Sequence, residues 1–106
     1  MIIFSKRIYT FYVYILTNKS RRVLYTGVTG NLHRRLHQHK TKLNPNSFTA
    51  RYNVSFLIYY EKYDWIQHAI AREKEIKDWS RAKKLTLIRE VNPNLNFLND
   101  LFENWI

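Results

Sequence analysis

The chain has 106 residues, and its 18 Lys and Arg against 8 Asp and Glu give a formal net charge of +10. This length fits one small domain over residues 1–106, and the absence of cysteine excludes disulfides, thiolate zinc sites and a cysteine nucleophile. No apolar run approaches the ~18 to 20 residues that cross a bilayer, and the short apolar start is no signal peptide, so we expect a cytoplasmic protein without a membrane partner.

The first predicted elements are two strands. Residues 10–17 (TFYVYILT) form a β-branched and aromatic run, and residues 23–28 form a second one. The polar residues 18–22 between them have the length and turn chemistry of a hairpin connection. We therefore expect the two strands to pair antiparallel.

A helix is predicted next, over residues 31–42. Asn31 can cap its first turn with the side-chain oxygen. An apolar stripe runs through Leu32, Leu36 and Leu43, which are spaced to share one side of a helix. This helix should therefore pack on the strands through its leucines.

A loop and a third strand follow. Residues 44–53 are polar and contain Pro45, which indicates a loop, and residues 55–62 (SFLIYYEK) have strand composition. Nearby tyrosines could stack on nucleic acid bases, but in such a pattern core positions are the better interpretation. These tyrosines are Tyr52, Tyr59, Tyr60 and Tyr63.

Two helices complete the predicted order. Asp64 can cap the first, whose stripe at three- and four-residue spacing is Ile66, Ala69, Ile70, Glu73, Ile76 and Trp79. Glu73 therefore sits on the core-facing edge of an otherwise apolar stripe. Ser80 can cap a further helix through about Val91, with Leu85, Leu87 and Ile88 inward. The tail is predicted to add a short helical turn through Leu98, Leu101, Phe102 and Trp105.

The predicted order is β-β-α-β-α-α. Such an order suits an α+β fold in which helices flank a small three-stranded antiparallel sheet. The order by itself indicates no function.

Short motifs along these elements point further. They are Tyr12-Val13-Tyr14, Tyr25-Thr26-Gly27, the helical run 31–39, Ala69-Ile70-Ala71-Arg72-Glu73, Ile76-Lys77 and Asn92-Pro93-Asn94-Leu95-Asn96. In order and setting this set resembles the GIY-YIG nuclease domain over roughly residues 10–97. The resemblance is strongest to small stand-alone members of a family that also includes the excision-repair incision domain and phage homing endonucleases. It implies phosphodiester hydrolysis in DNA with one divalent metal, Mg²⁺ or Mn²⁺, and no particular substrate.

The sequence departs from the family pattern at three positions. Tyr12 and Val13 stand where the first triplet has Gly and Ile, and Thr26 replaces the Ile of the second. Gly27 is kept, and one of only two glycines at this point indicates a sharp turn or a close approach to the backbone. These changes preserve strand character.

The resemblance assigns roles to five polar residues. Tyr14 and Tyr25 match the tyrosines of the two triplets, and the first is the family's proposed general base, which needs nearby cations because a free tyrosine has a pKa of about 10. Arg35 would stabilise charge on the phosphate, although an exposed helix arginine is the alternative. His39, one turn after Arg35, could orient a water or donate to a phosphate oxygen. Asn96 would fix the site, with a plain turn asparagine as an equal alternative.

Glu73 is the expected metal ligand. Mg²⁺ takes oxygen ligands, often one or two carboxylates with waters and substrate phosphates, so one glutamate suffices. The alternative is an i, i+4 ion pair with Lys77. A second possible metal pair, His33 and His37, is rejected because no third ligand has the right spacing.

The excess of positive charge points to a polyanionic partner, and DNA is the leading one. Candidate contacts to nucleic acid are Gly27, Arg34, Lys40, Lys42, Arg51, Lys74, Lys77, Arg81, Lys83 and Lys84. We therefore expect a metal-dependent DNA endonuclease, as a monomer or weak homodimer with a possible unknown protein partner. The alternative is a non-catalytic DNA- or RNA-binding module on the same fold.

Overall fold

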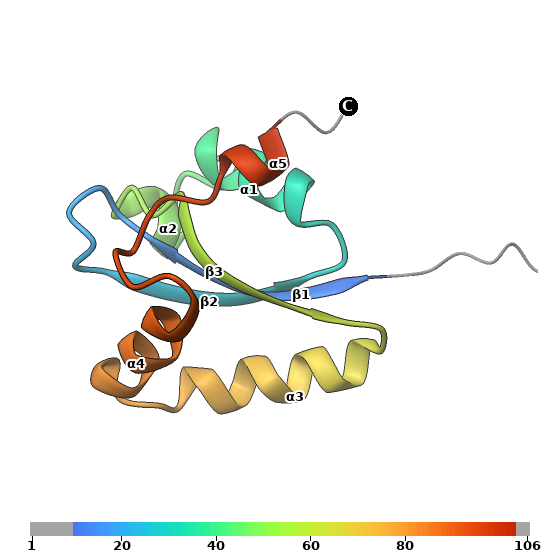
Figure 1. The fold of residues 1–106 in the computed structure, drawn as a ribbon. Coiled ribbons are helices and arrows are strands. Elements are labelled where there is room, and N and C mark those ends of the chain that lie inside the picture. Colours follow the sequence, from blue (N-terminus) through green and yellow to red (C-terminus); the bar gives the residue numbers. More distant parts are fainter. Residues whose placement is uncertain (1–9, 104–106) are drawn as a thin grey trace, which may run out of the picture.

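The computed structural model describes residues 10–103 of the chain (Figure 1). The chain start and Trp105, about which the sequence made predictions, lie outside this range. The strands are β1 (Phe11–Thr17), β2 (Leu24–Thr29) and β3 (Phe56–Tyr63), which form an antiparallel sheet in the order β2-β1-β3. The predicted hairpin and the α+β class are confirmed.

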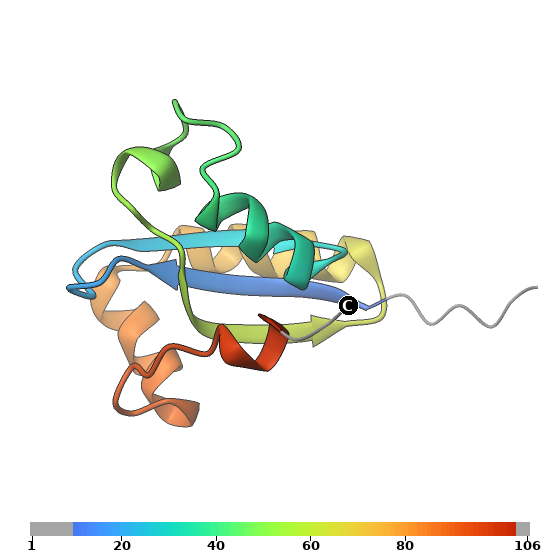
Figure 2. The same ribbon diagram turned by 90° about the horizontal axis from the view of Figure 1, so that it is seen from above.

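Helices cover both faces of this sheet. They are α1 (Leu32–Lys40), α2 (Phe48–Arg51), α3 (Ile66–Lys77), α4 (Arg81–Val91) and α5 (Asp100–Glu103). Figure 1 shows α1, α2 and α5 on one face and α3 and α4 on the other. Seen from above, α1 lies toward β2 and α5 toward β3 (Figure 2). Within residues 10–103, no helix is both long and apolar enough to span a membrane.

Strand alternation divides the buried residues into two cores. Tyr12, Tyr14 and Leu16 of β1 pack with α1 and α5, whereas Val13 and Ile15 pack with the helices of the other face. All five side chains are buried, because β1 is the central strand. The central strand therefore presents tyrosines to one face and branched aliphatic residues to the other.

The helix α1 begins as predicted but ends earlier. The Asn31 side chain accepts a hydrogen bond from the Arg34 N–H at 3.0 Å. The chain then leaves the helix through Lys42 at a φ of 54°, with the Leu43 N–H donating to the Gln38 carbonyl in a Schellman motif. Leu43 is therefore exposed, and its predicted place in the apolar stripe is wrong.

The predicted loop 44–53 contains the short helix α2. Ser47 caps it by accepting from the Ala50 N–H at 3.2 Å. Asn53, at a φ of 55°, ends it, and the Val54 N–H returns to the Thr49 carbonyl. A single turn of this length shows no hydrophobic periodicity, which explains why the sequence indicated only a loop.

The start of α3 also differs from the prediction. The helix begins at Ile66 with Trp65 as its N-cap and no capping side chain, so Asp64 lies one residue too early to cap it. Ile66 and Ile70, predicted to face the core, are partly exposed, whereas Ala69, Glu73 and Ile76 are buried. Ser80 caps α4 as predicted, through the Lys83 N–H at 3.2 Å.

The segment after α4 covers the outer edge of β3. Asn92 donates its side-chain amide to the Ile58 carbonyl at 2.9 Å. The Asn99 amide accepts from the Leu57 N–H at 2.9 Å and donates to the Ser55 carbonyl at 3.0 Å. Two asparagines therefore satisfy backbone groups that a fourth strand would otherwise pair.

Candidate active site

The site begins at the pairing of β1 with β2, where Tyr14 lies opposite Gly27. A Cβ atom at position 27 would lie 2.5 Å from both Cζ and Oη of Tyr14, far inside van der Waals contact. Only a glycine therefore lets the tyrosine ring cross β2. The close approach that the sequence indicated at Gly27 is to this ring.

The helix α1 places His39 against the Tyr14 hydroxyl. The Tyr14 Oη lies 3.1 Å from His39 Nε2, and His39 Nδ1 lies 2.9 Å from Thr49 Oγ1 of α2. A neutral imidazole donates from one nitrogen and accepts at the other. When Nδ1–H donates to Thr49, Nε2 accepts the proton of the Tyr14 hydroxyl. The Thr49 hydroxyl is in turn 3.3 Å from the Ser47 hydroxyl.

Burial and charge set the protonation of this pair. Tyr14 is fully buried, and burial raises its pKa far above the usual value. Tyr25 adds to this rise, Arg35 opposes it through its charge and a hydrogen bond, and Glu73 adds the smallest increase. Burial lowers the pKa of His39, and the Arg35 cation lowers it further. At neutral pH the pair is therefore a protonated phenol beside a neutral imidazole.

A pocket of about 340 Å³ opens beside this pair. Its lining residues are Tyr25, Arg35, Gln38, His39, Lys42, Leu43, Asn44, Ser47, Phe48 and Thr49, which include no carboxylate. Within residues 10–103, Arg35 makes no ion pair, so its charge is not neutralised by an acidic side chain. The pocket is consequently suited to an anion.

Glu73 lies on α3, across the sheet from α1, and does not line this pocket. It is only 7% exposed, and Lys77 Nζ lies 3.1 Å from its Oε1. Its negative charge acts on Tyr14, whose pKa it helps to raise. The structure thus contains both the inward carboxylate and the ion pair that the sequence offered as alternatives.

A lone carboxylate is a limited but sufficient donor for a hard divalent cation. In the part of the chain that the structure describes, no group of three or more His, Cys, Asp or Glu side chains forms a metal site. Mg²⁺ often binds through one or two carboxylates together with waters and substrate phosphates, so Glu73 fits such an ion if phosphate supplies further oxygens. The Lys77 ammonium would then have to release its share of the carboxylate.

The other predicted residues are spread more widely. Asn96 is exposed and lies beside β3, where it lines a separate pocket with Tyr59, Tyr60 and Asn92. Its backbone N–H and carbonyl both bond to the Asn92 side chain at 2.9 Å. The structure therefore does not bring Asn96 to the pocket of Arg35 and His39.

The basic residues divide between the two faces. Arg34, Lys40, Lys42 and Arg51 belong to α1, α2 and their connection, on the face of the pocket. Lys74 and Lys77 lie on α3, and Arg81, Lys83 and Lys84 on α4, across the sheet. The Lys83 ammonium lies 4.2 Å from the centre of the Trp79 ring. The predicted set therefore does not form a single patch.

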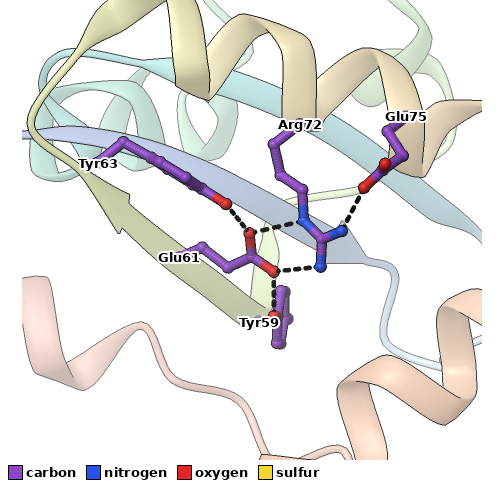
Figure 3. A network of polar contacts seen from close by, with 5 residues as sticks. All are labelled: Tyr59, Glu61, Tyr63, Arg72 and Glu75. Carbon is purple, nitrogen blue, oxygen red and sulfur yellow. Dashed lines mark hydrogen bonds and ion pairs between the residues drawn. The ribbon is translucent and has the colours of Figure 1, made fainter.

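A second polar cluster, which the sequence did not predict, occupies the α3 face. The Glu61 cluster consists of Tyr59, Glu61, Tyr63, Arg72 and Glu75 (Figure 3). Arg72 donates from Nε and Nη2 to the two Glu61 oxygens at 2.9 and 3.0 Å, and the Tyr63 hydroxyl donates at 2.6 Å. The Tyr59 hydroxyl also donates to Glu61, and Arg72 contacts Glu75. Alternation along β3 was the available signal, because residues 59, 61 and 63 share one side of a strand.

Thr49 is the second residue that the sequence did not reveal. It is buried in α2 and contacts His39 of α1 through its hydroxyl. No local pattern marks this threonine, because its contact depends on how the chain folds back after α1. Together with Tyr14, Tyr25, Arg35 and His39 it forms what we call the Tyr14 cluster.

Comparisons with known proteins agree with the motif pattern. The family model described as the GIY-YIG catalytic domain matches residues 10–86. A UPF0213 protein of Syntrophus aciditrophicus is 41% identical over 86 residues, which cover 77% of this chain and 92% of that protein. A UPF0213 protein of Natronomonas pharaonis is 38% identical over 79 residues, covering 74% and 91% of the two chains.

A solved structure also resembles this one. The solution NMR structure of the UPF0213 protein BH0048 from Bacillus halodurans superimposes with a TM-score of 0.52 at 26% identity. The match covers 92% of this chain and 99% of that chain. Sequence and structure comparisons therefore lead to the same group of small proteins.

Proposed function

The chain belongs to the GIY-YIG catalytic domain family, and on that premise we propose that it is an endonuclease that hydrolyses phosphodiester bonds in DNA with Mg²⁺ or Mn²⁺. The observation that carries this proposal is the convergence of Tyr25, Arg35 and His39 on one pocket, directly beside Tyr14. We further propose a cytoplasmic protein that acts as a monomer or weak homodimer.

Arg35 would bind the scissile phosphate. Its guanidinium lines the pocket, and within the described residues no carboxylate competes for it. Negative charge grows on the non-bridging oxygens during hydrolysis, and a planar guanidinium can donate two parallel hydrogen bonds to them. Arg35 would therefore bind the transition state more tightly than the substrate.

Tyr14 and His39 would accept the proton of the attacking water in a two-step relay. As water bonds to phosphorus, the bond from phosphorus to the leaving oxygen would break and that oxygen would keep the electron pair. The water proton would pass to the Tyr14 oxygen while the Tyr14 proton passes to His39 Nε2, which leaves an imidazolium. The neutral state of His39 supports this role, because only the neutral ring has a lone pair to accept the proton. Tyr14 is fully buried, so a neighbouring ring such as that of Tyr25 must move aside before water can reach the Tyr14 hydroxyl.

Glu73 would hold the metal. A bound divalent cation would polarise the phosphate and stabilise the leaving oxygen. Burial of Glu73 restricts the position of its carboxylate, and the Lys77 ammonium would pair with this carboxylate as long as no metal ion is bound. Arg34, Lys40, Lys42 and Arg51 would contact backbone phosphates from the pocket side, which positions DNA without reading its sequence.

A non-catalytic DNA- or RNA-binding module is the second candidate function. The observations that favour it are the full burial of Tyr14 and the engagement of both His39 nitrogens. Such a module would use the same cations to bind phosphates and would turn nothing over.

One experiment separates the two candidates. Labelled duplex, single-stranded and branched DNA are incubated with the full chain in Mg²⁺, Mn²⁺ or chelator, and cleavage by the wild type is compared with that by Glu73→Gln. We expect metal-dependent cutting that Glu73→Gln abolishes and that Glu90→Gln, an exposed acidic position on α4, retains. Binding of all substrates without any cutting would instead establish the binding module.

A further inference from the structure

The Tyr14 cluster continues outward as a row of rings. The ring centres of Tyr14 and His39 are 6.0 Å apart, and those of His39 and Tyr25 5.7 Å. Tyr25 then stacks on Phe48 at 6.3 Å with an interplanar angle of 24°, and Phe48 contacts Tyr52 at 4.9 Å. The row therefore leads from the buried Tyr14 hydroxyl to two rings at the surface.

The two outer rings are exposed although smaller neighbours are buried. Phe48 is 48% and Tyr52 49% exposed, whereas Thr49 and Ala50, on the same turn of helix, are each 5% exposed. Tyr52, for which the sequence favoured a core position, is therefore a surface residue. Burial of large aromatic side chains is a strong driving force in folding, so a turn that buries Thr and Ala and presents two touching rings leaves much apolar area available to a ligand.

This turn is held in one conformation. Ser47 caps its start, Asn53 ends it with a left-handed backbone, and Thr49 bonds to His39 of the neighbouring helix. A ligand that stacks on Phe48 and Tyr52 would therefore meet preformed ring faces and would spend little free energy on ordering them.

The positively charged residues around Phe48 and Tyr52 favour an anionic ligand. Arg35 and Lys42 line the adjoining pocket, which has no acidic residue, and the Arg51 guanidinium lies 6.0 Å from the centre of the Tyr52 ring. Rings that accept bases beside cations that accept phosphates are the combination that binds unpaired nucleic acid strands. A purely apolar protein partner would gain nothing from these charges.

We propose that Phe48 and Tyr52 form a stacking subsite for an unpaired nucleobase next to the phosphate held by Arg35. In a perfect duplex the base faces are covered by neighbouring base pairs, so a ring platform has no free base face to contact. The subsite rests on the proposed function for its position beside a scissile phosphate. It deepens that function by specifying that the bound nucleic acid has an unpaired base at this place. The unpaired base can come from a single strand or from a base extruded from a duplex.

Binding in chelator tests this subsite without any cleavage. Fluorescence anisotropy measures the affinity of the full chain for one labelled sequence as single strand, perfect duplex and duplex with one bulged base. We expect Tyr52→Ala to weaken binding of the strands with unpaired bases by about 5- to 150-fold, as expected for loss of one base-aromatic stack, and to leave the perfect duplex unaffected. A response of the bulged duplex alone would identify an extruded base, and a response of the single strand would identify single-stranded DNA.

Two further variants keep the result interpretable. Phe48→Leu retains apolar volume but has no ring face, so it should lose affinity in the same substrates. Trp65→Ala removes another exposed aromatic ring, at the start of α3, and should change nothing. Equal losses of affinity for the perfect duplex, losses as large with Trp65→Ala, or no loss with either Tyr52→Ala or Phe48→Leu would overturn the subsite.

The outcomes remain separate from those of the cleavage experiment. If the wild type cuts no DNA but Tyr52→Ala loses affinity for unpaired bases, the subsite stands and the nuclease proposal falls. If the wild type cuts and neither ring variant alters binding, the reverse holds.

Discussion

Each face of the sheet carries a cluster built on buried tyrosines, and the two clusters differ in what surrounds the hydroxyls. In both, burial raises tyrosine pKa values: that of Tyr14 on one face, and those of Tyr59 and Tyr63 on the other, the last to about 12. A strongly perturbed tyrosine therefore does not by itself indicate a reaction centre in this molecule.

The partners of the hydroxyls make the difference. In the Glu61 cluster, burial disfavours the Glu61 carboxylate, but hydrogen bonds from Arg72, Tyr59 and Tyr63 outweigh it and lower its pKa. Every charge there has its opposite in contact. In the Tyr14 cluster the hydroxyl meets a neutral histidine, and the nearby Arg35 cation has no acidic partner within the described chain. In the Glu61 cluster all charges are paired, and the ion pairs join α3 to β3. The Tyr14 cluster, in contrast, can still bind an anion at Arg35 and accept a proton at His39.

The sharpest test of this difference removes one hydroxyl from each cluster. We expect Tyr14→Phe to slow DNA cleavage by about 10²- to 10⁴-fold, the usual contribution of a proton-transfer group, and Tyr59→Phe to cleave at the wild-type rate. Single-turnover cleavage with saturating enzyme measures both. Equal rates for the two variants would remove the distinction between the clusters.

The converse test measures stability. Glu61→Ala removes the carboxylate that Arg72 and two tyrosine hydroxyls share, leaves the partly buried Arg72 with only the more exposed Glu75, and should lower the free energy of unfolding by about 2–4 kcal/mol. Arg35→Ala breaks no ion pair and should lower it by only about 0.5 kcal/mol. Urea unfolding at neutral pH compares the two. Replacing the pair together, as Glu61→Leu with Arg72→Met, should recover most of the loss, because the one charge that then loses its partner is the largely exposed Glu75.

A third test addresses the space that Tyr14 occupies. Gly27→Ala forces a methyl group into the Tyr14 ring and should cost about 1–3 kcal/mol of stability. The matched control is Gly30→Ala, whose new methyl would lie 3.6 Å from the Phe11 ring, an ordinary contact. In a double-mutant cycle, shortening the obstructing side chain by Tyr14→Leu should abolish the cost of Gly27→Ala. A cost that persists in the Tyr14→Leu background would show that the glycine serves another purpose.

The smallest expected effects separate the clusters by pH. The pKa of His39 is lowered on folding, so the unfolded chain binds more protons and stability should fall as pH drops below about 6.5. The pKa of Glu61 is also lowered, so its contribution is full above the unfolded value of about 4.3 and is lost as pH falls from there through its folded value. Urea midpoints against pH should therefore show two windows of loss. His39→Gln should remove only the upper window and Glu61→Gln only the lower one.

Local signals account for the parts of the fold that the sequence predicted. Asn31 and Ser80 bind the N–H groups of the turns that follow them, so their capping needs no knowledge of distant residues. The ends of elements were harder: Lys42 adopts a left-handed conformation usual for glycine, and Leu43 consequently leaves the helix.

The candidate site was predictable only as a set of residue types. The order of the motifs singled out Tyr14, Tyr25, Arg35 and Glu73, and of these the structure places Tyr25 and Arg35 on one pocket with Tyr14 beside it. No sequence motif indicated the contact of Thr49 with His39 or the exposure of Tyr52. Both depend on how the four-residue helix α2 packs beside α1. Long-range packing of short segments is the information that sequence periodicity lacks.

The asparagines that cover β3 also bear on how the chain is made. A nascent polypeptide that has not yet reached Asn99 has completed the whole sheet while the Leu57 N–H and the Ser55 carbonyl are still unpaired. During synthesis this strand edge could pair with the same edge of a neighbouring chain, as open edges do. Arrival of Asn92 and Asn99 closes this edge, so translation of residues 92–99 protects against association between nascent chains.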